Sequence, residues 1–209
     1  MTLVQNFHKY IQGVEFVQSV AQGDRFEHII SEKDKSGLMT LVVGMDSISH
    51  RIDLPSKKVL IHLLKNQRRA DSVIWEKRDE STYRLHIFEL KRTVTEAKWQ
   101  LIKDQFQGAF FVSLCIAKIL GLEVDTHVGL YTVYYEDQLD AVDNFTDNAL
   151  SDVEPDLPAK TKKAILEWTN DLCPFDFTGY LGQIKFLHKK IHLPNIKDGI
   201  PVGTRYITG

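Results

Sequence analysis

Apolar residues recur along the chain with helical spacing in some stretches and as short β-prone runs in others. Between residues 3 and 31 the spacing is mostly helical and is interrupted at Gly23, which predicts two short helices. Residues 38–45 are rich in Val, Leu and Thr, which predicts a strand. A proline and a serine open residues 55–67, and an apolar stripe follows them, so this segment is expected to be a helix.

The middle of the chain gives the clearest pattern. Residues 70–76 and 83–91 read as two strands joined by the polar turn KRDEST. A long amphipathic helix is expected over residues 96–120, ending at Gly121, and residues 126–135 form the next strand. Strands, then a long helix, then another strand predict a mixed α/β layered fold.

After the last of these strands the pattern weakens. Helical segments are expected near residues 138–150 and 159–171. Residues 174–209 are punctuated by Gly and Pro and read as a C-terminal extension wrapped on the core, with a short helix near 181–191. The expected fold is a mixed central β-sheet flanked by helices, with its core at about residues 38–135.

Composition limits the class of protein. A chain of 209 residues and 24.0 kDa is long enough for one sizeable core, so residues 1–209 are expected to form a single domain. The net charge of -2 gives no overall signal for nucleic acid or membrane. The two isolated cysteines, the polar residues spread through the N-terminus and the lack of a bilayer-length apolar run predict a cytoplasmic protein.

The charge is unevenly distributed. The segment from residue 54 to residue 70 carries five cations and no acid, namely Lys57, Lys58, Lys65, Arg68 and Arg69. These cations lead into Asp71, where they would neutralise the phosphates of a bound nucleic acid. A solvated helix face explains them equally well.

The pairing of the two middle strands is the most informative feature of the sequence. If the hairpin is centred on Glu80, Glu76 lies opposite Arg84 and apolar residues match apolar residues on one face. The same register places Asp71 opposite Glu89. A shift by one residue in either direction would set Glu76 against an apolar or aromatic residue, so the first register is favoured.

Two carboxylates opposite each other in a sheet lie about 5 Å apart at Cβ and repel each other unless a cation lies between them. Mg²⁺ or Mn²⁺ is the natural ion for oxygen ligands of this kind. Lys91 projects from the same face about 6 to 7 Å further along the strand, where an ammonium can hold a water or offset phosphate charge. The alternative interpretation is a sheet edge that carries a cross-strand salt bridge.

Asp71 at the start of one strand, Glu89, Leu90 and Lys91 near the end of the next, and a following long helix and strand resemble the PD-(D/E)XK nuclease superfamily over residues 70–135. The resemblance implies a restriction-endonuclease-like core with N- and C-terminal extensions. It also implies that Asp71, Glu89 and the Leu90 carbonyl hold Mg²⁺ (or Mn²⁺), and that Lys91 is catalytic. Gln107, on the helix, is expected to face the site. Such enzymes cut phosphodiesters by in-line attack of water and leave a 5′-phosphate.

The sequence departs from the family pattern at several positions. Ala70 stands where a proline is usual, and residues 56–67 contain no acid to complete the metal site, so Glu15 or Glu27 is the substitute. A second Glu-x-Lys, at residues 96–98, opens a helix and has no strand with an acid before it. Only the first copy has the expected context.

Two functions follow as hypotheses. The first is a metal-dependent DNA nuclease that relies on a homodimer or on partner proteins to select its substrate. The second is a catalytically inactive nuclease-fold scaffold or nucleic-acid-binding subunit of a defence or repair assembly. The sequence does not separate DNA from RNA. His188 and His192 stand four apart in HKKIH, as zinc ligands on a helix do, but a basic surface helix is the favoured interpretation.

Overall fold

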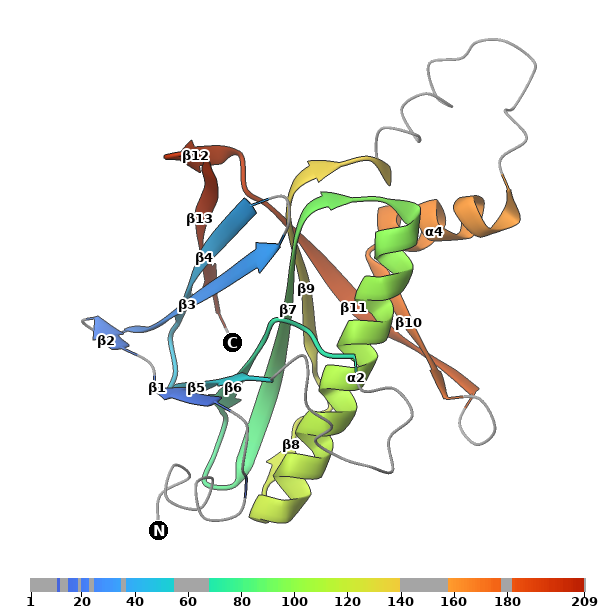
Figure 1. The fold of residues 1–209 in the computed structure, drawn as a ribbon. Helices are drawn as coiled ribbons and strands as arrows, with labels where there is room; N and C mark the ends of the chain where they lie inside the picture. The colour runs from blue at the N-terminus through green and yellow to red at the C-terminus, as the bar shows by residue number, and fades with distance from the viewer. Residues whose placement is uncertain are drawn as a thin grey trace.

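The computed structural model describes residues 11, 15–18, 20–22, 25–34, 37–54, 68–139, 158–177 and 182–208. These residues form a mixed α/β structure with two helices and two β-sheets (Figure 1). Neither helix in these ranges is long and apolar enough to cross a membrane.

The described elements follow one another along the chain with most strands in the N-terminal half. In order they are β1 (Glu15–Gln18), β2 (Val20–Gln22), β3 (Arg25–Asp34), β4 (Gly37–Met45), β5 (Ser49–Asp53), β6 (Ser72–Lys77), β7 (Thr82–Val94), α2 (Glu96–Leu120), β8 (Glu123–Val124), β9 (Gly129–Asp137), α4 (Ala159–Thr169), β10 (Leu172–Phe177), β11 (Gly182–His192), β12 (Asn195–Lys197) and β13 (Ile200–Ile207).

The larger sheet has the strand order β1-β5-β6-β7-β9-β11-β10, with β8 beside β7. β5, β6 and β7 form an antiparallel meander, and β9 lies parallel to β7. Parallel neighbours need a crossover, and α2 provides it between β7 and β9. The strands at the centre of the sheet are nearly all buried, as expected for a sheet covered on both faces.

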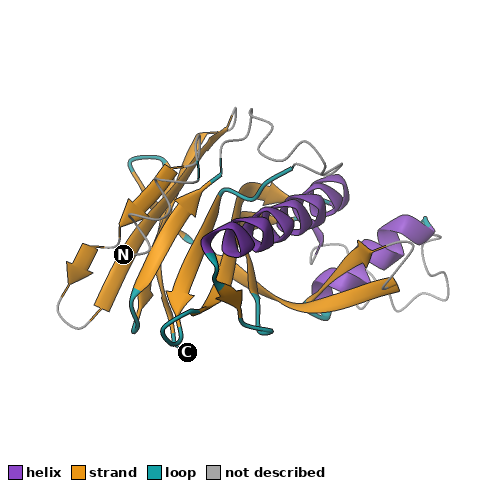
Figure 2. Ribbon diagram, turned by 90° about the horizontal axis from the view of Figure 1, so that it is seen from below, coloured by secondary structure: helices purple, strands orange, loops and turns teal. Residues whose placement is uncertain are grey.

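Helix α2 covers one face of the larger sheet (Figure 2). The Thr95 side chain accepts a hydrogen bond from the backbone N–H of Lys98 and caps the N-terminus, and Gly121 at φ 70° ends the helix in the left-handed conformation. Trp99, Ile102 and Phe106 are fully buried against the sheet. Burial of side chains of this size stabilises the fold by about 1.5–3 kcal/mol each, so this face anchors α2 firmly.

The second sheet packs on the opposite face of the larger one. Its strand order is β12-β13-β4-β3-β2, and β13 lies parallel to β4. Leu41 and Val43 of β4 share a buried cluster with Phe88 and Leu90 of β7. Because side chains alternate along a strand, Phe88 and Leu90 of β7 face this second sheet, whereas the odd-numbered Leu85 and Ile87 face α2.

The structure confirms several elements expected from the sequence. β4, the pair β6 and β7, α2, β9 and α4 all lie where the pattern predicts them, with boundaries shifted by a few residues. The mixed α/β class is also confirmed. The helices predicted at 55–67 and, apart from its first two positions, 138–150 lie outside the described residues.

Two predictions were wrong. The described residues between 15 and 34 form strands and not helices, because the buried positions of β3 alternate: His28 and Ile30 are buried, whereas Ile29 is 59% exposed. The short helix near 181–191 is the strand β11, which pairs with β9 and β10. Residues 174–209 were also expected to be an extension wrapped on the core, but β11 is a strand of the larger sheet and β13 is a strand of the second sheet.

Candidate active site

Strands β6 and β7 carry the three residues singled out from the sequence. Their pairing has the expected register, since paired residue numbers sum to 160 from Ser72 with Phe88 to Lys77 with Tyr83. Asp71 lies immediately before β6, and Glu89 and Lys91 lie in the second half of β7. As odd-numbered residues of β7, both are on the face that α2 covers.

The Asp71 and Glu89 carboxylates each accept a hydrogen bond from the backbone of the neighbouring strand segment. The Leu90 backbone N–H donates to Asp71 Oδ2 at 2.7 Å, and the Asp71 backbone N–H donates to Glu89 Oε2 at 3.2 Å. These two bonds continue the strand pairing beyond Ser72, where the regular ladder ends. Asp71 and Glu89 thus lie side by side at the end of the β6 and β7 pairing.

Lys91 supplies the positive charge in this cluster. Its ammonium donates to Glu89 Oε1 and, at 3.1 Å, to the Leu90 carbonyl oxygen. Both oxygens belong to groups that the nuclease resemblance assigns to the metal. The ammonium thus contacts the oxygens from which a divalent ion would be coordinated.

Burial sets the protonation of the cluster. Glu89 is fully buried and the Lys91 side chain is 13% exposed. Burial raises the pKa of Glu89 to about 7 although Lys91 opposes the shift, and burial together with the Glu89 carboxylate raises the pKa of Asp71 well above its usual range. Burial alone would lower the pKa of Lys91, but the carboxylates of Glu89 and Asp71 outweigh it and the pKa rises.

A third acid, Glu32 of β3, influences the same groups. Its charge raises the pKa of Asp71, Glu89 and Lys91. The substitution of Glu15 or Glu27 for the missing helix acid stays a prediction. The raised pKa of Asp71 and of Glu89 means that their ionised forms are costly in this environment, and a bound cation would favour those forms. The all-oxygen donor set fits a hard divalent ion. Among the described residues, however, no three His, Cys, Asp or Glu side chains are grouped so as to hold a metal.

Helix α2 contacts the segment that leads into β6, residues 68–70, through Gly108 and Gln105. A Cβ at Gly108 would lie 1.8 Å from the Arg68 carbonyl oxygen, so only glycine permits this approach. The Gln105 side chain donates to the Arg69 carbonyl oxygen at 3.1 Å. Gln107 is half-buried two residues further on, about 200° around the helix from Gln105. Its role at the site stays a prediction.

The basic flank is described only at its end. Arg68 is exposed and pairs with Asp104 of α2 at 2.5 Å, whereas Arg69 is buried. Arg68 therefore offers the more accessible cation for a phosphate near Asp71. Lys57, Lys58 and Lys65 lie outside the described residues.

The histidines of HKKIH lie on the strand β11 and not on a surface helix. His188 is buried and its Nε2 lies 2.8 Å from the Thr132 hydroxyl, with the rings of Trp99 and Trp168 beside it. His192 is exposed and stacks on Tyr134. Residues four apart on a strand point to the same face but lie about 13 Å apart, so they do not form a helical zinc pair.

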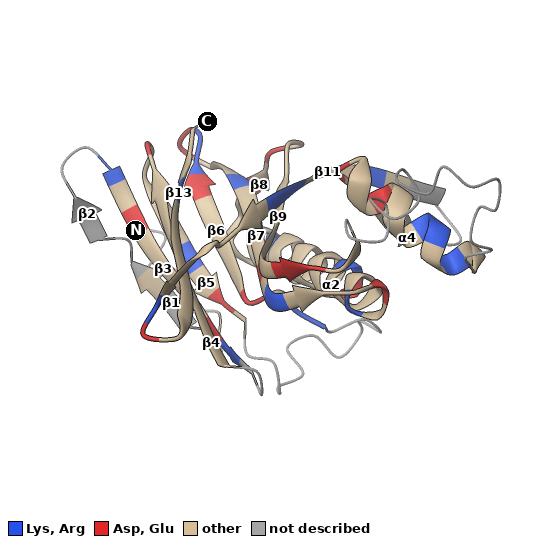
Figure 3. Cartoon of the chain, turned by 90° about the horizontal axis from the view of Figure 1, so that it is seen from above, with Lys and Arg blue, Asp and Glu red and all other residues tan. Residues whose placement is uncertain are grey.

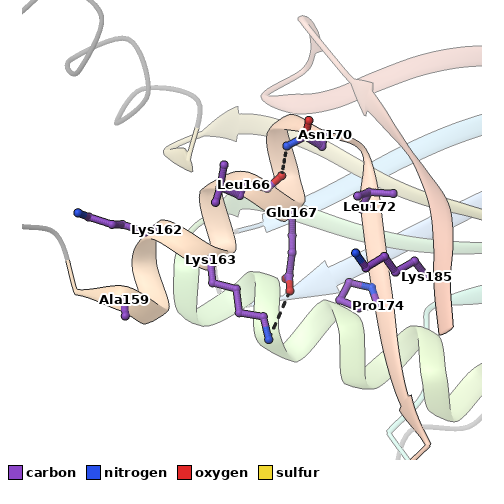
Figure 4. A pocket seen from close by; sticks show the side chains of 9 residues that line it. All are labelled: Ala159, Lys162, Lys163, Leu166, Glu167, Asn170, Leu172, Pro174 and Lys185. Carbon is purple, nitrogen blue, oxygen red and sulfur yellow. Dashed lines mark hydrogen bonds and ion pairs between the residues drawn. The ribbon is translucent and has the colours of Figure 1, made fainter. Parts of the chain in front are cut away.

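Further lysines line a cavity of about 490 Å³ between α4 and β10 (Figure 4). Lys163 pairs with Glu167 across 3.8 Å, and Lys185 of β11 reaches the same cavity. Lys162 also lines this cavity. This cavity is lined by residues of α4, β10 and β11 and by none of the Asp71 cluster.

Comparison with known proteins provides no family for the chain. No protein-family model, curated protein or solved structure matches it. A function for the chain therefore rests on the residues and contacts described above.

Proposed function

We propose that the chain is a metal-dependent nuclease that hydrolyses phosphodiester bonds in DNA at the cluster of Asp71, Glu89 and Lys91. The proposal rests on the hydrogen bonds that place the half-buried Asp71 carboxylate at the Leu90 N–H and the fully buried Glu89 carboxylate at the Asp71 N–H, with the Lys91 ammonium bound to Glu89. A carboxylate pair of this kind is costly in a core and is typical of sites that bind a cation.

The order of elements supports the proposal. Three antiparallel strands are followed by a long helix and a strand parallel to the third. This is the order of elements in which the nuclease resemblance expects the Asp and Glu-x-Lys residues.

Asp71, Glu89 and the Leu90 carbonyl would hold the ion. When bound, Mg²⁺ or Mn²⁺ supplies Lewis acidity that polarises a phosphoryl oxygen and makes a water a better nucleophile. The chain's own contribution is to present three oxygens from two strands and to keep the acids in a dry environment. The Lys91 ammonium, displaced from Glu89, would orient a water or offset the charge that develops on the phosphate.

The proposal is tested by incubating the purified chain with plasmid, single-stranded DNA and structured RNA, each with Mg²⁺, with Mn²⁺ and with chelator. Metal-dependent cutting is expected in the parent and absent in Asp71→Asn and Lys91→Met. Lys98→Met is the matched control, because Lys98 belongs to the second Glu-x-Lys and lies on α2. Cutting that persists in chelator or in Asp71→Asn would contradict the proposal.

One observation favours the second candidate, an inactive nuclease-fold scaffold that binds nucleic acid. Lys91 already provides a cation for Glu89 and Leu90, so the cluster can serve as a structural ion pair without a metal. Fluorescence anisotropy with labelled DNA distinguishes the two. Binding that is retained without cutting under every metal condition supports the scaffold.

A further inference from the structure

A second site lies on the face of the larger sheet away from α2. A cavity of about 390 Å³ opens there, and its lining includes Arg84 and His86 of β7, Tyr131 of β9 and Lys189 of β11. Tyr131 shares the cluster between the two sheets with Phe88, whereas Glu89 points to the other face. The cavity is therefore separate from the Asp71 cluster.

A buried chain of polar groups ends at the floor of this cavity. Glu76, His86 and Tyr131 are 2%, 3% and 3% exposed. His86 Nε2 lies 3.0 Å from Glu76 Oε2, and His86 Nδ1 lies 3.1 Å from the Tyr131 hydroxyl. Ser47 and Arg78 donate to the other oxygen of Glu76. A buried carboxylate, imidazole and phenol in series are costly to assemble, and they fix the hydroxyl of Tyr131 in place.

Gly129 shows that the space at this hydroxyl is required. It pairs with His86 across the parallel strands, and a Cβ at Gly129 would lie 2.7 Å from the Tyr131 hydroxyl oxygen and 3.0 Å from His86 Nδ1. Any larger residue would displace the phenol from the imidazole. The absence of a side chain at residue 129 thus preserves the arrangement.

The protonation states of Glu76, His86 and Tyr131 suit hydrogen bonding and not nucleophilic attack. Hydrogen bonds from His86 and Ser47 outweigh the effect of burial and lower the pKa of Glu76 to about 2, so Glu76 accepts and His86 Nε2 carries a proton. Burial and the Glu76 charge raise the pKa of Tyr131 to about 12. Tyr131 therefore remains a neutral hydroxyl at physiological pH. Because His86 Nδ1 accepts its proton, the Tyr131 oxygen can only accept a further hydrogen bond from a ligand in the cavity.

The cavity walls combine cations with apolar surface. The Lys189 ammonium lies 5.8 Å from the centre of the Tyr131 ring. The Arg84 side chain is 20% exposed, and its Nε donates to Asp125 Oδ2 at 3.1 Å. Ile184 and Leu187 of β11 also line it and are 39% and 73% exposed. Figure 3 shows Lys and Arg along β11. Cations beside exposed aliphatic side chains suit a ligand with an anionic end and a flat apolar part.

We propose that this cavity binds a phosphate group joined to a nucleoside, with the phosphate at Arg84 and Lys189, the Tyr131 hydroxyl as a further hydrogen-bonding group, and the base against Leu187. The volume is in the range of small-molecule sites and suits about one nucleotide. The same chemistry is present in a free nucleoside monophosphate and at the 5′-phosphorylated end of a strand.

Isothermal titration calorimetry of the full chain in EDTA tests the proposal without metal-dependent hydrolysis. The probes are AMP, adenosine, inorganic phosphate, and one hexanucleotide with and without a 5′-phosphate. AMP is expected to bind at least tenfold more tightly than adenosine or inorganic phosphate. Whichever binds more tightly, AMP or the phosphorylated hexanucleotide, identifies the source of the ligand. A hexanucleotide that binds equally with and without its phosphate would overturn the proposal.

Variants locate the site. Lys189→Gln is expected to weaken AMP binding about tenfold and Tyr131→Phe about fivefold, while thermal melting shows that both still fold. The matched control is Lys162→Gln with Lys163→Gln in the neighbouring α4 cavity, which should leave the affinity within twofold. Failure of every probe to bind at millimolar concentration would overturn the proposal, as would parental affinity in Lys189→Gln or an equal loss in the α4 control.

Discussion

Replacing Glu89 with glutamine removes the most deeply buried charge of the candidate active site and nearly preserves its shape. Burial holds the pKa of Glu89 at about 7 in the folded chain, against an ordinary value of 4.5. A difference of this size corresponds to about 3 kcal/mol, because one pKa unit is worth about 1.4 kcal/mol. Glu89 has no exposed surface, so solvent screening does not reduce this figure.

The sign of the effect follows from linkage. Between pH 4.5 and pH 7 the folded chain keeps a proton on Glu89 that the unfolded chain has lost, so rising pH costs the folded state stability. From about pH 5 to about pH 8 the parent should lose about 2 to 3 kcal/mol relative to Glu89→Gln. Lys91 remains charged in the parent over this range, since the carboxylates of Glu89 and Asp71 raise its pKa.

Urea unfolding followed by circular dichroism at several pH values measures this difference. Glu80→Gln, in the exposed turn between β6 and β7, is the control for the removal of one negative charge, and its unfolding free energy should run parallel to that of the parent. If the free energies of Glu89→Gln and the parent also run parallel from pH 5 to pH 8, the buried acid does not have the environment described here.

Two further predictions concern packing around α2. Gly108→Ala should lower the unfolding free energy by about 2 to 4 kcal/mol, because its Cβ would meet the Arg68 carbonyl oxygen at 1.8 Å. Gly121→Ala has open space around it and should cost only about 1 kcal/mol, so equal losses in urea unfolding would contradict the close approach. Glu167→Leu leaves Lys103 buried without its carboxylate and should cost about 3 to 5 kcal/mol. The double variant with Lys103→Met should recover most of that loss, and no recovery would contradict a buried ion pair.

The candidate site was predictable because its signals are local. The register of β6 and β7 follows from matching apolar residues and one ion pair across a short turn, and the structure has that register. The placement of Asp71 beside Glu89 then follows from strand geometry alone. Helix α2 was predictable for the same reason, since an amphipathic pattern with a Thr cap and a terminal Gly is contained within one segment.

The strands β3 and β11 were not predictable from periodicity, because their buried positions include histidines. His28 of β3 is buried with its Nε2 at 2.8 Å from the Ser49 hydroxyl, and His188 of β11 is buried among aromatic rings. Each histidine breaks the apolar alternation that marks a strand. Their partners come from distant segments, so only the tertiary structure makes burial favourable there.

Glu32 was missed for a related reason. The nuclease resemblance directs attention to a helix before the first acid, whereas the acid whose charge reaches Asp71 comes from β3. The sequence pattern predicts helices for the residues that form β3, so it gives no indication that Glu32 lies near Asp71. The proximity of Glu32 to Asp71 depends on how the two sheets pack on each other, which local sequence patterns do not encode.

A crystal structure of the chain soaked in Mn²⁺, with anomalous diffraction recorded, tests the central claim most directly. We expect an anomalous peak coordinated by Asp71, Glu89 and the Leu90 carbonyl, with the Lys91 ammonium moved away from Glu89. An unchanged bond between Lys91 and Glu89, with no peak beside the two carboxylates at saturating Mn²⁺, would contradict it.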